Sequence, residues 1–324
     1  MVFKEIILPI LLFIIGLVLI VKGGDVFVDA ATYIAEANGI PKILVGVTIV
    51  SFATTLPEVL VSLIASIGGN NDMAIGNAVG SVNANIGLIF ALLMVFCPGV
   101  AKRSGYMLKA FLMLGACVTL AVFGLIGVLT WPAIVILLGV FALFMFFNIK
   151  DAKKAILLGE GDGEDKPEKT KKLMIKNIIL FIVGTLAVGG GALLLVEYGP
   201  VLATMIGVPD AIVSAIFVAI GTSLPELVTA ITAIVKKQGA LSMGNIIGAN
   251  IIDLAIILPV CALIGGGTLS FNLQNMYLDL PVCLLIGAIA LAPSLITQKI
   301  SRVQGICLLT VYTAYIILMC MYFI

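Results

Sequence analysis

The sequence predicts an all-α polytopic membrane protein with ten transmembrane helices, arranged as two inverted repeats of five helices. Two features of the chain lead to this expectation. Of its 324 residues, 62% are apolar and only 11% are charged, whereas a soluble domain carries about 25% charged residues. The second half of the chain also repeats the motifs of the first half at a constant spacing. A chain of this composition is expected to face lipid along most of its length.

The internal repeat is visible in three pairs of motifs. Gly39-Ile40-Pro41 matches Gly207-Val208-Pro209, Thr54-Thr55-Leu56-Pro57-Glu58 matches Thr222-Ser223-Leu224-Pro225-Glu226, and Gly76-Asn77 matches Gly244-Asn245. In every pair the second member lies 168 positions after the first, as Glu226 does after Glu58. Such a constant spacing without gaps indicates a duplication.

Each copy contains five apolar segments of the length that a membrane-spanning helix needs, about 20 residues. The segments begin near Ile6, Ile40, Met73, Tyr106 and Trp131 in the first copy, and near Leu173, Val208, Leu241, Met276 and Arg302 in the second. Because five is odd, the second copy enters the membrane from the opposite side, as in many secondary transporters. We therefore expect one repeat over residues 1–149, a linker over 150–172 and an inverted repeat over 173–324.

The basic residues orient these segments. With the amino terminus outside, every Lys and Arg except Lys4 falls in a cytoplasmic connection, and such connections attract basic residues. We expect a multi-pass protein of the cell membrane with both termini outside and the linker in the cytoplasm. The expected partners are the lipid bilayer and cations, with no nucleic acid and no resident cofactor.

The absence of histidine restricts the possible chemistry. None of the six cysteines forms a C-x-x-C pair, so sites built from His or Cys ligands and histidine acid–base catalysis are not expected. An intramembrane enzyme would have only paired carboxylates to work with. We therefore expect a protein that is not an enzyme.

Three acidic residues, Glu58, Glu226 and Asp253, are expected deep inside apolar segments. A charged side chain at the bilayer centre costs about 2.5–3.5 kcal/mol on insertion scales, and such residues are usually functional. No Lys or Arg is expected at the same depth, so a bound cation is the natural counter-ion. The structural alternative is a protonated, hydrogen-bonded carboxyl that only specifies helix packing.

The neighbours of the two glutamates fit a cation site. Pro57 and Pro225 are expected to break their helices in mid-membrane, where freed carbonyls are tolerated if they line a cavity. Two hydroxyl residues lie one helical turn before each glutamate and share its face: Thr54 and Thr55 before Glu58, and Thr222 and Ser223 before Glu226.

The third segment of each copy adds a polar stripe. Residues spaced by four lie on one helix face, and the two stripes are Asn77, Ser81 and Asn85, and Asn245, Ala249 and Asp253. The donors of the whole set are oxygens, and Ca²⁺ takes about 6–8 oxygen ligands. Three ionised carboxylates would be neutralised either by Ca²⁺ or by several Na⁺ ions, and this competition is a physical basis for exchange.

These motifs resemble the α-repeats of the sodium/calcium exchanger family, most specifically in Ala219–Glu226 and Gly244–Asp253. The resemblance implies an antiporter that exchanges Ca²⁺ for Na⁺ by alternating access. It implies Glu58 and Glu226 as central carboxylates and Thr54 and Thr222 as carbonyl ligands of calcium. It also implies sodium positions lined by Ser51, Thr55, Ala219 and Ser223, a middle completed by Asn85 and Asp253, and first and sixth spans that slide across the others.

The chain departs from the family pattern at two positions. Val82 stands where an asparagine is usual, with the amide displaced to Asn83, and Ser51 replaces a small apolar residue. The lack of a glutamate near Gly80 and Gly248 favours sodium over protons as the driving ion. Calcium/proton antiport, potassium co-transport and, in a different class, a calcium-permeable channel remain compatible with the same oxygen ligands.

Overall fold

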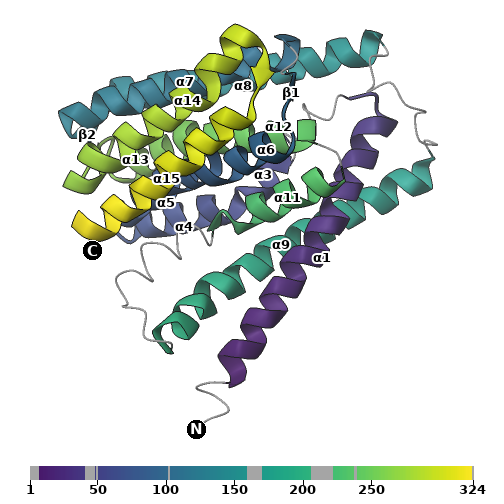
Figure 1. Cartoon of the computed structure of the whole chain (residues 1–324), viewed down its shortest axis with the longest axis horizontal. Coiled ribbons are helices and arrows are strands. Elements are labelled where there is room, and N and C mark those ends of the chain that lie inside the picture. Colours follow the sequence, from purple (N-terminus) through teal and green to yellow (C-terminus); the bar gives the residue numbers. More distant parts are fainter. Residues whose placement is uncertain are drawn as a thin grey trace.

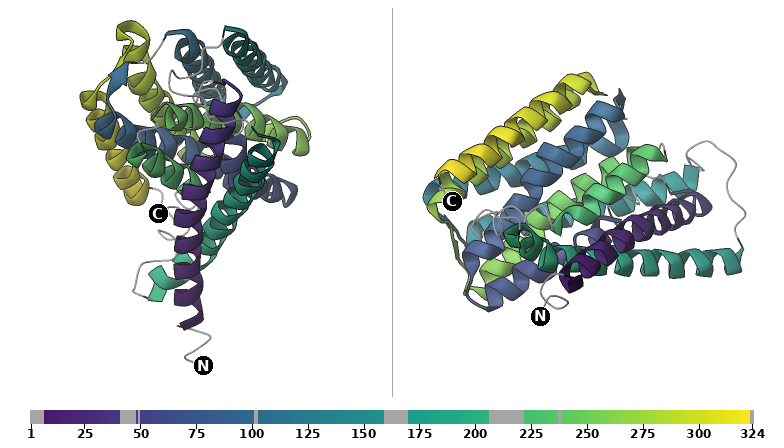
Figure 2. Two further views of the ribbon diagram at one scale, coloured as in Figure 1. Left: turned by 90° about the vertical axis from the view of Figure 1, so that its right-hand side faces the viewer. Right: turned by 60° about the horizontal axis from the view of Figure 1, so that its bottom comes forward.

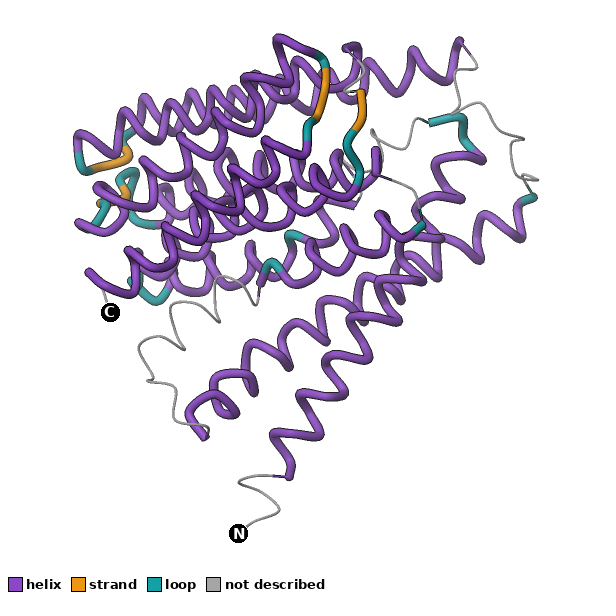
Figure 3. Tube along the Cα trace, viewed as in Figure 1, coloured by secondary structure: helices purple, strands orange, loops and turns teal. Residues whose placement is uncertain are grey.

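The computed structural model describes residues 7–40, 48, 50–100, 103–158, 170–205, 222–236 and 239–322. These residues form a helical bundle with a few two-residue strands at its ends (Figure 3). Within the described ranges, eight helices are long and apolar enough to cross a membrane, and two shorter apolar helices, Leu56–Ile67 and Leu224–Val235, lie beside them. The chain is a multi-pass membrane protein.

The elements of the first copy follow the predicted segments closely. They are α1 (Leu8–Ala37), α3 (Ser51–Thr54), α4 (Leu56–Ile67), α5 (Asn71–Ala84), the π-helical segment η3 (Asn85–Phe90), α6 (Ala91–Phe96), β1 (Gly99–Val100), α7 (Arg103–Ile126), β2 (Val128–Leu129) and α8 (Trp131–Leu158).

The second copy repeats this order after the linker. Its described elements are α9 (Lys171–Met205), α11 (Leu224–Val235), α12 (Gly239–Ile252), the π-helical segment η4 (Asp253–Ile257), α13 (Leu258–Ile264), β3 (Leu269–Ser270), the π-helical segment η5 (Asn275–Asp279), α14 (Leu280–Thr297), β4 (Lys299–Ile300) and α15 (Arg302–Tyr322). Residues 206–221, which include Pro209 and Ala219, lie outside the described part.

The third segment of each copy forms the centre of the bundle. In an 18-residue apolar stretch of Asn71–Phe96, 78% of the residues are buried, and in Gly239–Ile264 the share is 83%. In Lys171–Gly191, at the periphery, it is 11%. The outer surface carries large apolar side chains such as Leu125 and Ile296, each 83% exposed. Such an exterior suits lipid. Lipid tails are as apolar as these side chains, so exposing the side chains to lipid carries no free-energy cost.

Helices α1 and α9 cross each other and project from the rest of the bundle (Figures 1 and 2). Glycines allow this crossing, because a Cβ at Gly191 would lie 2.7 Å from the Gly16 carbonyl oxygen, and a Cβ at Gly184 would lie 2.8 Å from the Phe27 nitrogen. Small residues bring helix backbones together in membranes in this way. The two helices therefore pack through their backbones as a pair.

The two copies are also joined at the ends of the bundle. Strand β1 pairs with β4 and strand β2 pairs with β3, both antiparallel, so each pair takes one strand from each copy. Lys236, at the end of α11, makes ion pairs of 2.7 Å with Asp29 and 3.7 Å with Asp25 on α1. Contacts between the copies thus extend from the core to the surface.

Two expectations about charged residues are wrong. Lys109, assigned to a cytoplasmic connection, is buried in α7, and its Nζ makes no hydrogen bond within the described residues; its electrostatic partner is Asp151 of α8. Asp279 is a fourth acidic residue that is buried within an apolar segment. Its carboxylate accepts hydrogen bonds from Tyr315 and Asn275, both at 2.9 Å, and from Gln274 at 3.3 Å. This carboxylate is therefore a satisfied structural group.

Candidate cation site

A proline near the start of α4 and another near the start of α11 are each followed directly by a glutamate. Thr55 separates α3 from α4, and Pro57 is the second residue of α4, where its missing N–H costs no helical hydrogen bond. Pro225 is likewise the second residue of α11. Glu58 and Glu226 consequently lie in the first turns of α4 and α11, where the helix dipole favours negative charge.

The three predicted carboxylates are buried, and most of their oxygens make no hydrogen bond to another described residue. Glu58 is 1% exposed, and Glu226 and Asp253 are 0% exposed. Among the described residues, both oxygens of Glu58, both of Asp253 and Oε2 of Glu226 have no hydrogen-bond partner. The carboxylates of Glu58, Glu226 and Asp253 also act on one another electrostatically. Buried polar groups are normally hydrogen-bonded, so these five oxygens form an unusual, strongly electronegative centre.

Two hydrogen bonds join the two copies, and each is the counterpart of the other in the sequence repeat. The Thr54 hydroxyl donates to Oδ1 of Asn245 at 3.2 Å, and the Thr222 hydroxyl donates to Oδ1 of Asn77 at 3.1 Å. Thr222 and Asn245 lie 168 positions after Thr54 and Asn77. Each broken helix is thus tied to the central helix of the other copy.

The two asparagines are held by further hydroxyls. Nδ2 of Asn77 donates to Ser62 Oγ at 2.9 Å and to the Glu58 carbonyl at 3.1 Å, and Nδ2 of Asn245 donates to Thr229 Oγ1 at 3.3 Å. Sequence reasoning missed Ser62 and Thr229 as members of the site. Their position one turn after each glutamate was the available signal, because residues three or four apart share a helix face.

The remaining hydroxyls lie beside the carboxylates. Thr55 Oγ1 donates to the Ser51 carbonyl at 2.6 Å and lies 3.5 Å from Glu226 Oε1. Ser51 Oγ donates to the Asn245 carbonyl at 3.0 Å, which ties α3 to α12. Ser223 Oγ is buried and makes no hydrogen bond to another described residue. Hydroxyl oxygens keep lone pairs when they donate, so all three remain able to bind a cation.

The α-helices of the central segments change to π-helix at equivalent residues. The π-helical segment η3 begins at Asn85, and η4 begins at Asp253, which lies 168 positions later. π-Helical turns are rare and are often found at functional sites. Oδ1 of Asn85 is buried without a partner, like the two oxygens of Asp253.

The structure buries every predicted site residue that it describes. Eleven of the twelve are buried: Ser51, Thr54, Thr55, Glu58, Asn77, Asn85, Thr222, Ser223, Glu226, Asn245 and Asp253. Ala219 lies outside the described residues. In the part of the chain that the structure covers, no group of three His, Cys, Asp or Glu side chains is placed to bind a metal ion by itself. An ion bound here would therefore also need hydroxyl, amide and carbonyl oxygens.

The displaced amide of the first copy has a structural role. Val82 is fully buried in the apolar core, whereas Nδ2 of Asn83 donates to the Asp279 carbonyl at 3.2 Å. Asn83 therefore ties α5 to the backbone of Asp279, the last residue of η5. The amide that the family pattern has at position 82 is thus found at position 83, where it contacts the polar cluster around Asp279.

A buried set of carboxylate, amide and hydroxyl oxygens at the middle of a bundle of apolar helices defines an integral membrane protein with a candidate cation site. The sequence pattern described as "Sodium/calcium exchanger protein" matches residues 8–150 and 176–321. The chain therefore belongs to the sodium/calcium exchanger family, whose members are transporters.

Individual relatives agree with this assignment. The chain is 34% identical over 260 residues to the inner membrane protein YrbG of Escherichia coli, covering 78% of this chain and 79% of the relative. It is 29% identical over 300 residues to the sodium/calcium exchanger MaX1 of Methanosarcina acetivorans, covering 78% and 82%. A solved structure of the sodium-calcium exchanger NCX_Mj, soaked with Na⁺ and Sr²⁺, superposes with a TM-score of 0.80 at 29% identity over 96% of this chain and 98% of that one. The protein is thus an antiporter of the cation/Ca²⁺ exchange class.

Proposed function

We propose that this protein exchanges Ca²⁺ for Na⁺ by alternating access around the site between α4, α5, α11 and α12. The observation that carries the proposal is the set of five buried carboxylate oxygens that make no hydrogen bond to any other residue that the structure describes. An uncompensated buried charge is strongly destabilising, so these oxygens require a cation during the transport cycle. The site offers oxygen ligands, which suit Ca²⁺ and Na⁺.

The proposed ligands are those expected from the sequence. Glu58 and Glu226 would be shared by both ions, and Thr54 and Thr222 would contribute carbonyl oxygens to Ca²⁺. The remaining ligands would serve Na⁺ and the middle of the site: Ser51, Thr55, Asn77, Asn85, Ala219, Ser223, Asn245 and Asp253. MaX1 is described as a sodium/calcium exchanger, and NCX_Mj structures were soaked with Na⁺, Ca²⁺ or Sr²⁺, which supports these two ions here.

The proposal includes the membrane arrangement. The two shorter helices α4 and α11 complete a set of ten spans, in two inverted repeats over residues 1–149 and 173–324. Both termini would lie outside the cell membrane and the linker over 150–172 in the cytoplasm, as the basic residues predict. Inversion fits a site to which each copy contributes one broken helix and one polar stripe.

Calcium flux in proteoliposomes tests the driving ion. An imposed Na⁺ gradient should drive Ca²⁺ uptake at a fixed membrane potential, and an imposed pH gradient alone should not. Glu226→Gln should abolish uptake, while Asp279→Asn, which alters a buried carboxylate outside the site, should retain it. Near-normal uptake by Glu226→Gln would overturn the site assignment.

The same experiment decides the alternative. Calcium/proton antiport is chemically available because a buried carboxylate can take up a proton in place of a metal ion. Uptake that follows the pH gradient and ignores Na⁺ would leave the site in place and replace the coupling ion.

A further inference from the structure

The two residues that begin the π-helical segments differ in one chemical respect. Asp253 offers two equivalent acceptor oxygens, so its side chain presents an acceptor in either orientation. Asn85, at the equivalent position of the first copy, has one acceptor end and one donor end. If its amide were turned around, the N–H₂ group would face the site and repel a cation.

A second amide fixes the orientation of Asn85. Nδ2 of Asn85 donates to Oδ1 of Asn250 at 3.1 Å, and Asn85 Oδ1 is buried without a partner among the described residues. Nδ2 of Asn250 in turn points at the Met113 sulfur at 3.7 Å. A thioether accepts hydrogen bonds and never donates them, so Met113 determines which end of Asn250 faces Asn85.

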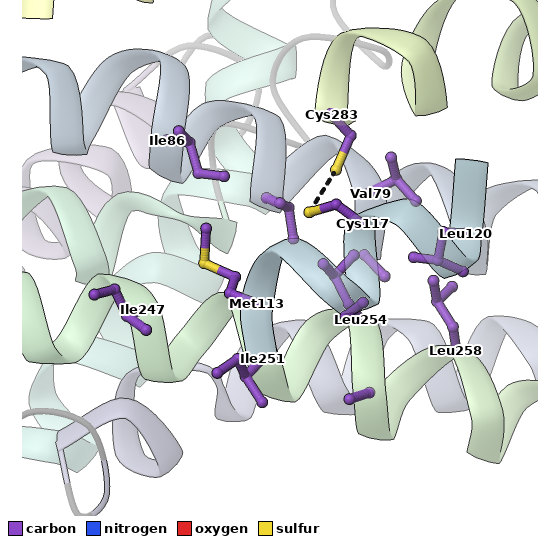
Figure 4. Close-up of a cluster of buried hydrophobic side chains, with 14 of the residues drawn as sticks. Val79, Ile86, Met113, Cys117, Leu120, Ile247, Ile251, Leu254, Leu258 and Cys283 are labelled. Atoms are coloured by element: carbon purple, nitrogen blue, oxygen red, sulfur yellow. Dashed lines mark hydrogen bonds between the residues drawn. The ribbon is translucent and has the colours of Figure 1, made fainter. Parts of the chain in front are cut away.

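Asn85, Asn250 and Met113 form a buried chain of two hydrogen bonds, called the relay below. Asn250 is 0% exposed, and Asn85 and Met113 are each 1% exposed. Met113 belongs to the apolar cluster between α7 and α12, together with Ile247 and Ile251 (Figure 4). Water does not reach the relay to exchange its hydrogen bonds, and an apolar surrounding makes each remaining polar contact more decisive.

We propose that Asn250 is a positioning residue that turns the carbonyl oxygen of Asn85 toward the transported cation, and that Met113 holds Asn250 in this orientation. The inference rests on the proposed function, because it assigns the free oxygen of Asn85 to the ion. It assigns a role in ion binding to Asn250 and Met113, which are not among the proposed ligands.

The sequence repeat supports the assignment. The residue 168 positions before Asn250 is Val82, which cannot make a hydrogen bond with its side chain. Helix α5, which carries Val82, contacts η4, just as α12, which carries Asn250, contacts η3. The amide of Asn85 thus has an orienting partner, while the carboxylate of Asp253, which needs none, is matched with a valine. This pairing gives a reason for the valine that departs from the family pattern.

Equilibrium binding of ⁴⁵Ca²⁺ to the purified full-length protein tests the inference. Asn250→Val should weaken calcium binding about three- to tenfold, the range expected for one hydrogen bond. Asn148→Val is the matched control, because Asn148 is an equally buried amide that bonds only to the Phe144 carbonyl of its own helix. It should leave calcium affinity unchanged.

A second background separates orientation from packing. In Asn85→Asp the side chain at position 85 has two acceptors, so adding Asn250→Val should change affinity less than twofold. An equal loss in both backgrounds, or no loss in the unmutated background, would overturn the inference. Met113→Leu keeps the apolar volume and should weaken binding in the same direction, which provides a test if Asn250→Val does not fold.

Failure of the proposed function has a different signature. If the unmutated protein binds no ⁴⁵Ca²⁺, the calcium site itself is wrong and the role of Asn250 is overturned with it. If the unmutated protein binds calcium and Asn250→Val binds equally well, only the relay is wrong.

Discussion

Replacing Glu58 by glutamine should have opposite effects on the empty and the calcium-bound protein. In the empty protein the substitution removes one of three mutually repelling buried carboxylates, so the variant should unfold at a higher temperature than the unmutated protein. In the calcium-bound protein it removes a charged ligand, neither of whose oxygens has a hydrogen-bond partner in the described part of the chain. Calcium affinity depends strongly on the number of charged ligands, and we expect a loss of about 100-fold, or about 2.7 kcal/mol.

The size of the calcium effect follows from binding linkage. At a Ca²⁺ concentration of about 100 times the dissociation constant, the unmutated protein gains about 2.7 kcal/mol of stability. A site with 100-fold weaker affinity gains only about 0.4 kcal/mol at the same concentration. Thermal unfolding of the detergent-solubilised protein, with Ca²⁺ and with chelator, should therefore show a shift that nearly disappears in Glu58→Gln.

A matched variant controls for general damage. Asp279→Asn changes a carboxylate that is also buried but is hydrogen-bonded by three side chains. It should lower the unfolding temperature and keep the calcium-dependent shift. A full calcium shift in Glu58→Gln would refute the assignment of its carboxylate to the ion.

Three other predictions test separate parts of the structure. Gly191→Ala should destabilise the crossing of α1 and α9 by about 1–3 kcal/mol, because its Cβ would lie 2.7 Å from a backbone oxygen of α1. Gly189→Ala, whose Cβ would have nothing within 4 Å, should not destabilise it. Thermal unfolding of the two variants tests this difference. Thr54→Val and Thr222→Val should each cost about 1 kcal/mol of unfolding free energy, and clearly unequal losses would show that the two cross-links are not equivalent. Tyr315→Phe should destabilise by about 1–3 kcal/mol without changing ⁴⁵Ca²⁺ affinity; an altered affinity would connect the polar cluster of Asp279 to the ion site.

The parts of the site that follow from local spacing could be predicted from the sequence. Pro57 and Pro225 specify where two helices begin, and the glutamate after each proline must then lie in the first turn. The four-residue spacing of Asn77, Ser81 and Asn85 specifies a common helix face. These relations extend over one or two helical turns, and helical geometry alone determines them.

The parts that depend on distant partners could not be predicted in this way. Asp279 lies near the start of an apolar segment, and its burial depends on Tyr315, 36 residues later. Lys109 lies within two turns of Lys102 and Arg103, so the linear pattern placed it in a loop. Asn250 was within a recognised motif, but its role depends on an amide 165 residues away and on the direction in which both amides point. Spacing contains no information on that direction.

The cross-links between the copies have a consequence for the synthesis of the protein. Thr54 and its partner Asn245 are separated by 191 residues, so at a translation rate of about 5–20 residues per second the partner emerges about 10–40 seconds later. During that interval Glu58 is already in the nascent chain, while Glu226 and Asp253 are still to be made. The first five helices must therefore hold an incomplete, acidic half-site in or near the membrane until the second copy arrives. Insertion machinery that retains early helices, or a delayed entry of α4 into the lipid, would protect the chain during this period.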